Sequence, residues 1–327
     1  MKMRALAGLG LAGMLLSAGA AGADQFGTGD NQFTIDFVTI TANPGVTRST
    51  NTSGDTIETF TAGAGVSDYT DPGYDYRIGV YETTNDQWNK FRAELAPVPV
   101  TGDPTSAYDR DPSWTGTNVP TNEVSWYEAA QFVNWLNTST GHHAAYKFTG
   151  TQGTSGYALD TWSAAEANNG TNLYRHKDAF YYLPTEDEWL KAGYWDGTDI
   201  QRWTTPDGTQ PVEDVEANYD NESGAQPWDV GTGAKELNGT FDMMGNAWEW
   251  TESPYSDRYY GTNATRGVRS GSYFVSGNYL ASSSRVSINP SSANISFGFR
   301  VASEVPEPCS LVLLSLGGLA LAKRRRR

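Results

Sequence analysis

Cysteine and histidine are the residues that this sequence uses least. Its single cysteine, Cys309, lies in an apolar run close to the C-terminus, so the rest of the chain has no disulfide, thiolate nucleophile or thiolate metal site. The three histidines, His142, His143 and His176, lack the spacing of two histidines and a carboxylate that is typical of non-haem iron. We interpret them as surface-loop residues. A Gly-x-Ser-x-Gly nucleophile elbow is also missing, although composition leaves Ser-His-Asp catalysis open.

Basic residues are also scarce. The chain has 23 Lys and Arg against 38 Asp and Glu, a formal net charge of −15. Seven of the basic residues lie at the two ends, so residues 24–304 hold 16 basic and 37 acidic residues, a charge of about −21. Such a balance repels phosphate backbones and attracts cations, so no nucleic acid partner is expected.

Long apolar runs occur only at the two ends of the chain. Residues 1–23 combine a basic start, an apolar run and a final Ala-Gly-Ala, the pattern of a secretory signal peptide, so the mature chain is expected to begin near Asp24. At the other end, 14 residues from Cys309 to Ala322 precede the basic residues 323–327. A helix of this length spans roughly 21 Å, against ~30 Å of bilayer hydrocarbon, which makes a plain membrane anchor a marginal alternative.

Residues 304–327 resemble a bacterial PEP-CTERM sorting signal. They contain the sequence VPEP, a short apolar helix and a terminal cluster of arginines. The resemblance implies recognition and removal by an exosortase-type membrane protease, with transient membrane anchoring through this tail. It also implies export to the cell envelope or the extracellular space.

The residues between these ends predict one loop-rich domain, residues 24–303. The alternation in "FTIDFVTITA" predicts a strand with Phe33, Ile35 and Phe37 on one face. Short strand-like pieces such as "RGVRSGSYFV" and "FGFRVA" come late in the chain, after three expected helices. This order indicates an α+β fold with little regular secondary structure.

The three helices are predicted from one sequence motif, the reciprocal capping box, in which a Ser or Thr is followed three residues later by Glu or Gln. In the second helix, Ala129, Phe132, Val133 and Leu136 make an apolar face at helical spacing. Asp187 and Glu188 are assigned to the third box, with solvated side chains. The three boxes are Thr84 with Gln87, Ser125 with Glu128, and Thr185 with Glu188.

Six pieces occur in an order that resembles the sulfatase-modifying-factor family, whose founding activity is formylglycine generation. They are "YRIGVYETTNDQWNKF", "PTNEVSWYEAAQFVNWLN", "LPTEDEWLKAGYW", "NGTFDMMGNAWEW", "RSGSYFVSG" and "FGFRV". The resemblance runs from about Phe33 to Ala302. It implies a single compact domain related to C-type lectins, with bound calcium.

The segment "DMMGNAWEW" is the piece that resembles a calcium loop of the family. The resemblance places the side chains of Asp242 and Glu249 and the carbonyls of Gly245 and Ala247 on the ion. Calcium takes such hard oxygen ligands, and Gly245-Asn246 tolerates the left-handed backbone that turns carbonyls inward. A turn followed by a strand with a solvated Glu is the alternative. A second, weaker calcium site is implied at Asn218 and the carbonyl of Tyr219.

The sequence departs from the family at its chemical centre. Formylglycine formation in the family resembles oxidation at copper held by two cysteines, and the matching positions hold Val275 and Leu280. Because soft thiolates select Cu(I), bound copper is not expected here. Tyr182 stands where the family usually has an arginine before Leu-Pro-Thr. Arg300 is expected to be structural, and Arg285 is a candidate for contact with a ligand.

The expected function is therefore that of a calcium-stabilised binding or matrix protein of the cell envelope that has lost formylglycine formation. Its aromatic, acidic composition suits a glycan or peptide ligand. An alternative is an oxidoreductase of the formylglycine-generating or non-haem iron type that acts on another substrate. A calcium-dependent sugar binder rests on analogy with C-type lectins alone.

Overall fold

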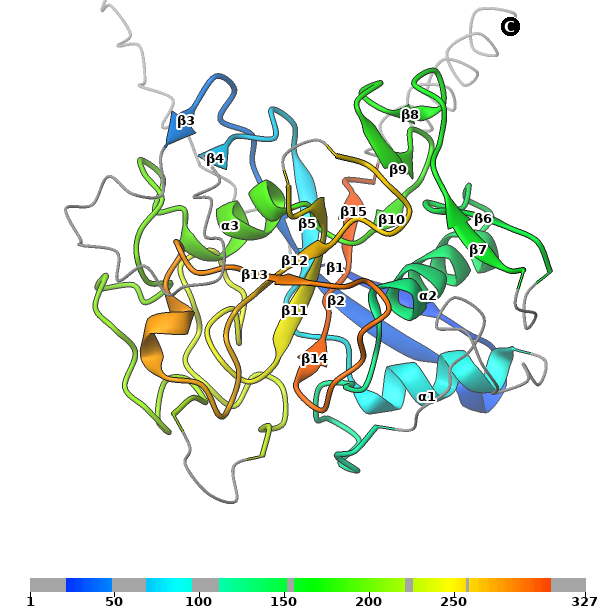
Figure 1. Cartoon of the computed structure of the whole chain (residues 1–327). Helices are drawn as coiled ribbons and strands as arrows, with labels where there is room; N and C mark the ends of the chain where they lie inside the picture. The colour runs from blue at the N-terminus through cyan, green and yellow to red at the C-terminus, as the bar shows by residue number, and fades with distance from the viewer. Residues whose placement is uncertain are drawn as a thin grey trace, which may run out of the picture.

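A computed structural model describes residues 22–48, 69–95, 112–151, 156–220, 226–256 and 259–306 (Figure 1). Nearly all of the predicted sorting tail and of the predicted signal peptide lie outside these ranges, but residues 304–306 and 22–23 lie within them. Within them no helix is both long enough and apolar enough to cross a membrane. The elements, in chain order, are β1 (Gly22–Phe26), η1 (Gly29–Asn31), β2 (Phe33–Ile40), β3 (Thr47–Arg48), β4 (Tyr69–Thr70), β5 (Tyr76–Gly79), α1 (Asn85–Glu94), α2 (Trp126–Ser139), β6 (Lys147–Thr149), β7 (Ala158–Asp160), β8 (Ala167–Asn168), β9 (Asn172–His176), β10 (Tyr181–Tyr182), α3 (Glu186–Tyr194), β11 (Trp248–Pro254), β12 (Arg266–Arg269), η2 (Gly277–Leu280), β13 (Val286–Ile288), β14 (Phe297–Gly298) and β15 (Ala302–Glu304).

A five-stranded sheet joins the two ends of the domain, with strand order β1-β2-β5-β15-β10. All four pairings are antiparallel. The predicted alternation in β2 is confirmed, because Phe33, Ile35 and Phe37 are buried and the residues between them are exposed. Since β1 starts at Gly22, removal of a leader before Asp24 would take the first two residues of this strand.

All three predicted helices are confirmed, and each capping box is complete in both directions. A capping box acts within four residues, so the sequence specifies these helix starts without help from the rest of the fold. The four apolar positions of α2 are fully buried, and α2 packs next to β10 and α1. The prediction that Glu188 is solvated is wrong, because its side chain is fully buried. Asp187 is half-buried.

A four-stranded sheet, β13-β12-β11-β14, forms the second layer. Strand β14 runs parallel to β11, and the other pairs are antiparallel. Trp248, Glu249 and Trp250 of β11 are all buried, so the alternative of a solvated Glu249 is wrong: this strand is covered on both faces.

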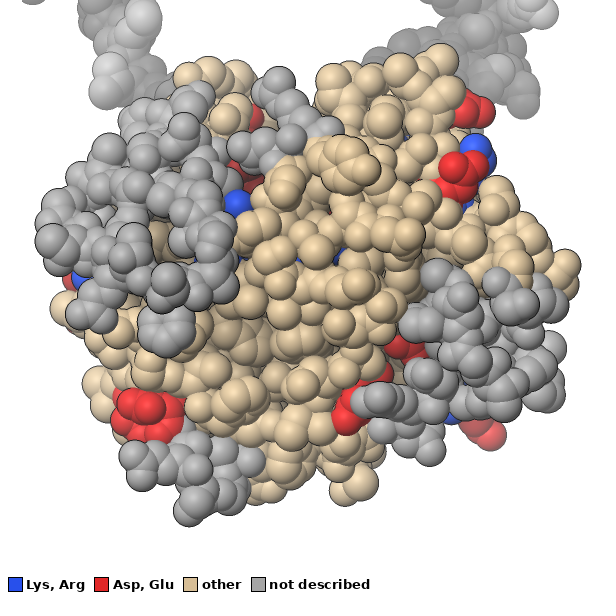
Figure 2. Space-filling view, in the orientation of Figure 1, with Lys and Arg blue, Asp and Glu red and all other residues tan. Residues whose placement is uncertain are grey.

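Loops make up much of the described chain, around a core rich in aromatic rings, which matches the predicted α+β, loop-rich class. Trp88, Trp126, Trp189 and Trp250 are almost fully buried. In Figure 2 the centre of the visible face is made of uncharged residues, and the charged side chains that show lie mostly at its rim. Several charged side chains, among them Arg175, Glu188 and Arg300, are instead buried in the interior.

Candidate functional site

The loop after β12 holds Val275 and Leu280, the two positions that the family resemblance sets against the copper cysteines. Ser270 and Gly271 turn the chain with positive φ angles of 89° and 79°. A Cβ atom on Gly271 would lie 2.7 Å from Leu280 Cδ2 and 3.3 Å from Val275 Cγ2. The structure therefore brings Val275 and Leu280 together against one glycine. Both are apolar, so this place offers no ligand for copper.

Hydroxyl groups and aromatic rings surround this loop. The Ser272 hydroxyl is buried and has no hydrogen-bond partner among the described residues. The Trp114 ring packs edge-on against Tyr273 with centroids 5.7 Å apart, and Phe274 is 48% exposed. A buried hydroxyl without a partner is costly, so such groups point to a ligand or ordered water.

The turn before β11 has the backbone that its sequence predicts. Gly245 and Asn246 have φ angles of 87° and 60°, which confirms the left-handed conformation. Asp242 adopts a similar φ of 60°. A Cβ atom on Gly245 would lie 2.2 Å from the Asn218 carbonyl oxygen. Glycine is therefore required both by the positive φ angle and by the lack of space for a side chain.

The two carboxylates predicted to bind calcium have protein partners in the structure. Arg300 contacts both oxygens of Glu249, at 2.6 and 2.7 Å, and the Trp189 indole N–H donates to Glu249 Oε2 at 2.7 Å. Arg300 is thereby a buried structural residue, as predicted. The backbone N–H of Gly231 donates to Asp242 Oδ2 at 2.6 Å. Burial raises the pKa of Asp242 to about 6.

Sequence analysis missed a third carboxylate at this turn, that of Glu82. The side chain of Asn246 donates to Glu82 Oε2 at 2.7 Å, and the backbone N–H of Ala247 donates to Glu82 Oε1 at 3.0 Å. Burial, with Asp242 and Glu249 nearby, raises the pKa of Glu82 well above its usual value. Three buried carboxyl groups therefore face one guanidinium, and a cation or protons must offset the excess negative charge.

The second predicted calcium segment lies beside the first. The Asn218 amide donates to Asn246 Oδ1 and to the Gln226 carbonyl, both at 3.1 Å. The Asn218 carbonyl accepts the backbone N–H of Asn246 at 2.8 Å. Tyr219 directs its hydroxyl to the Pro211 carbonyl at 2.7 Å. The described residues contain no group of three or more His, Cys, Asp and Glu that could hold a metal, so any calcium site there depends on carbonyl oxygens.

Arg285, the candidate for ligand contact, has a carboxylate partner. Its guanidinium meets Glu186 through two hydrogen bonds of 2.8 and 2.6 Å and lies 3.9 Å from the centre of the Tyr255 ring. Arg269 binds the same Glu186 at 2.9 Å. Contact between Arg285 and a ligand therefore stays a prediction, with Glu186 as its competitor.

The histidines are arranged differently from the expectation of three loop residues. His142 and His143 are exposed, but His176 is buried at the end of β9, so for His176 the prediction is wrong. The rings of His143 and His176 stack with centroids 3.6 Å apart, and burial together with His143 lowers the pKa of His176. Parallel stacked rings direct their nitrogen lone pairs side by side rather than toward one point, so they do not form a chelate.

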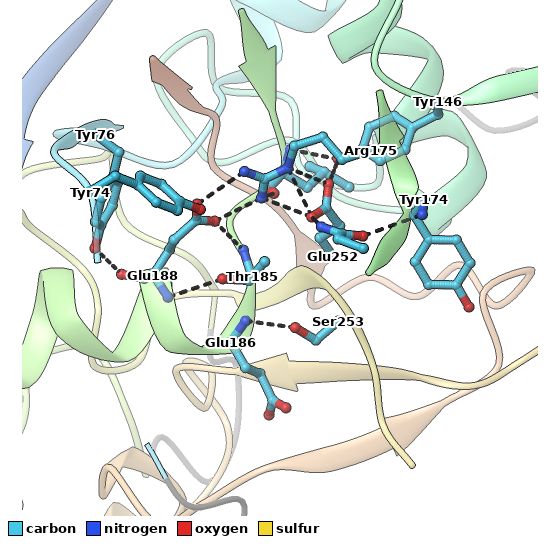
Figure 3. A network of polar contacts seen from close by, with 12 residues as sticks. Tyr74, Tyr76, Tyr146, Tyr174, Arg175, Thr185, Glu186, Glu188, Glu252 and Ser253 are labelled. Atoms are coloured by element: carbon cyan, nitrogen blue, oxygen red, sulfur yellow. Dashed lines mark hydrogen bonds and ion pairs between the residues drawn. The ribbon is translucent and has the colours of Figure 1, made fainter. Parts of the chain in front are cut away.

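Figure 3 shows a buried ion-pair network centred on Arg175, of which sequence analysis marked only Glu188, as a capping residue. Arg175 binds Glu188 at 2.8 and 3.0 Å and Glu252 at 3.0 Å, and all three side chains are almost completely buried. Its guanidinium lies 3.5 Å from the centre of the Tyr182 ring. Although burial raises the pKa of Glu188, contact with Arg175 holds it below its usual value. An arginine from β9 thus stacks on the tyrosine that stands where the family usually has arginine.

Tyrosine hydroxyls complete the network. Tyr74 donates to Glu188 Oε1 at 2.6 Å, and Tyr146 donates to Glu252 Oε1 at 2.8 Å (Figure 3). Because its five side chains come from five separate segments, the network ties the start of α3 to β11 and β9. It is a structural centre, since each charged group is satisfied by protein.

A family model described as "Sulfatase-modifying factor enzyme 1-like domain" matches residues 39–305. Hercynine oxygenase of Mycobacterium tuberculosis is 34% identical over 140 residues, which are 38% of this chain and 32% of that protein. Hercynine oxygenase of Mycolicibacterium smegmatis is 27% identical over 250 residues, 70% of this chain and 53% of that protein. The chain therefore spans about a third to a half of the curated relatives that it matches.

Two solved structures show a similar fold. Treponema denticola variable protein 1 matches with a TM-score of 0.61 and 21% identity, covering 86% of this chain and 99% of that one. PvdO from Pseudomonas aeruginosa matches with a TM-score of 0.57 and 17% identity, covering 86% and 98%. At these identities the likeness shows the fold alone, and it confirms the predicted fold class.

Proposed function

Because the chain belongs to the sulfatase-modifying factor enzyme 1-like domain family, we propose that it is an oxidoreductase of this family, acting on a substrate other than a sulfatase cysteine. The observation that carries the proposal is its similarity to curated relatives that are named oxygenases. That similarity favours this function over the binding-protein role expected from composition.

The residues of this chain fit a part of such a site. Val275 and Leu280 exclude the two-cysteine copper centre, and the described residues contain no other cluster for a redox metal. What the loop after β12 does offer is an apolar floor, a buried hydroxyl without a partner in the described chain, and the exposed ring of Phe274. These groups suit substrate binding, and the described residues do not themselves provide a ligand set for a redox metal.

Oxygen uptake tests the proposal. The purified full chain is mixed with hercynine, or with a cysteine-containing peptide, and with added Fe(II) or Cu(I), and consumption of O2 is followed with an electrode. Hercynine-dependent uptake that falls when Phe274 is replaced by Ala supports the proposal, whereas uptake with the cysteine-containing peptide alone contradicts the choice of substrate. Uptake no greater than that of the metal alone with both substrates contradicts it.

A second candidate, a calcium-stabilised binding or matrix protein, is favoured by the buried carboxyl groups at the turn before β11. Asp242 and Glu249, with the carbonyls of Gly245 and Ala247, would hold the ion, and Glu82 is a third buried carboxyl group beside them. Calcium there would stabilise the turn by offsetting charge that is otherwise buried. Elemental analysis after purification without chelator separates the candidates: calcium alone at about one or two per chain favours this one, and stoichiometric iron or copper favours the oxidoreductase.

We further propose that the protein is exported, with residues 1–23 removed as a signal peptide and residues 304–327 processed by an exosortase-type protease. The sequence patterns at both ends support this. Mass spectrometry of the mature protein from its native cells reports both termini, and an intact C-terminal tail would contradict the sorting proposal.

A further inference from the structure

Two hollows meet on the outer face of the β1–β2 hairpin, away from the loop after β12. One has a volume of about 850 Å³ and lies between this hairpin and residues 235–241. The other, of about 440 Å³, lies between the hairpin and the start of α1. Both are lined by Asp36 of β2, so they adjoin at this residue, and we call the two together the hairpin groove. Its size is that of a site for a small ligand or a short chain.

The floor of the hairpin groove follows from strand register. Ala23 of β1 pairs with Asp36 of β2, and Gln25 pairs with Thr34. All four are exposed, and the residues between them point into the core. Because alternate residues of a strand share a face, Gln25, Thr34 and Asp36 form a polar strip, with the methyl group of Ala23 beside Asp36.

The walls of the hairpin groove supply hydrogen-bond donors, hydrogen-bond acceptors and the aromatic ring of Tyr81. Amide side chains are contributed by Gln32 and Asn118, while the amide nitrogen of Asn238, which also lines the groove, already donates to the Lys191 and Trp195 carbonyls. Tyr81, which is half-buried, packs against Phe241 with ring centroids 5.4 Å apart and lines the larger hollow. Amides both donate and accept, and an aromatic face packs on apolar C–H surface.

The charges in the hairpin groove nearly cancel. Lys90 is paired with Asp86 at 2.8 Å, four residues earlier on α1. Burial raises the pKa of Glu236 to about 8, so this carboxyl group is mostly neutral at pH 7. Asp36 and Lys235 remain as one charge of each sign. A ligand with a strong net charge finds no matching field here, even though the whole chain is acidic.

We propose that the hairpin groove binds an uncharged oligosaccharide, with Asp36 and Gln25 accepting and donating hydrogen bonds to sugar hydroxyls at its centre. Sugar hydroxyls are both donors and acceptors, as the strip and the amides require, and one ring face can lie on Tyr81. The site is separate from the loop after β12, so it does not depend on the oxidoreductase proposal.

Calorimetric titration tests this, using the full chain in a detergent without a sugar head group. The probes are cellohexaose, maltohexaose and the chitin hexamer, with an uncharged polar hexapeptide for comparison. The variants are Asp36→Ala and Gln25→Ala, both at exposed strand positions, and the control is Asp178→Ala, at an exposed carboxylate outside the groove.

Saturable binding of at least one hexasaccharide, weakened tenfold or more by Asp36→Ala and by Gln25→Ala but not by Asp178→Ala, is the expected result. Circular dichroism of each variant should match that of the unchanged protein. Binding of the peptide but of no hexasaccharide overturns the proposal. It is likewise overturned if no probe binds, or if a sugar binds and neither groove variant weakens it.

Discussion

Replacement of Arg175 by methionine removes the guanidinium from the buried network of Figure 3 and keeps most of the side-chain volume. Glu188 and Glu252 would then share a region in which both side chains are 0% exposed, without the cation between them. Removing one partner of a buried ion pair costs about 3–5 kcal/mol, because the remaining charge stays desolvated. We expect a loss of this size in the free energy of unfolding at pH 7.

The loss should depend on pH with a definite sign. In the unchanged protein the pKa of Glu188 is held low, so its stabilising effect is present above the unfolded pKa of about 4.3 and is lost as pH falls. In the variant, burial raises the folded-state pKa of both Glu188 and Glu252 above that value, so folding takes up protons and stability falls as pH rises. The difference between the two proteins should therefore grow from pH 5 to pH 8.

Thermal unfolding followed by circular dichroism measures this effect. At about 2 °C for each kcal/mol in a domain of this size, the melting temperature should fall by about 6–10 °C at pH 7. Tyr182→Phe is the matched control, because it keeps the ring under the guanidinium and removes a hydroxyl that has no hydrogen-bond partner in the described chain. A fall below 2 °C in Arg175→Met, or an equal fall in the control, would refute the reasoning.

Three further predictions concern other sites. Gly245→Ala should lower the free energy of unfolding by more than about 2 kcal/mol, because its Cβ would meet the Asn218 carbonyl at a positive φ; chemical denaturation checks this, and an unchanged midpoint contradicts it. Val275→Cys with Leu280→Cys should create Cu(I) binding, measured by competition with a chelator, whereas either single variant should bind far more weakly. Glu236→Gln should become more stable than the unchanged protein as pH rises from about 4.5 to 8, since burial raises the pKa of this group to about 8 and its charged form is disfavoured; parallel melting curves at all pH values would contradict this.

The helix starts and the turn before β11 could be predicted because each is decided by neighbours in the chain. A capping box closes between residues three apart, and Gly245-Asn246 adopts the left-handed backbone through its own steric freedom. The alternation of buried and exposed residues in β2 could also be predicted locally, because alternate side chains of any strand lie on the same face. The family resemblance rests on the order of such local pieces.

The exposure of Glu188 was predicted wrongly because it depends on residues that are distant in the chain. The capping box explains why Glu188 is present, and in isolation such a residue lies in water. Arg175 and Tyr74 reach it from far along the chain, and their hydrogen bonds permit its complete burial. The stacking of His143 on His176 has the same origin, because it joins two loops that only folding brings together.

The sequence by itself determined the helix starts, the turn before β11, the acidic net charge and the absence of the copper cysteines. Each of these follows from residue identity or from contacts within a few residues. Only the tertiary structure decided which carboxylates are buried, that Arg175 lies on Tyr182, and that Asp36 lines both hollows of the hairpin groove. These features depend on where distant segments cross, and burial in a low dielectric then sets the charge state and the partners of each group.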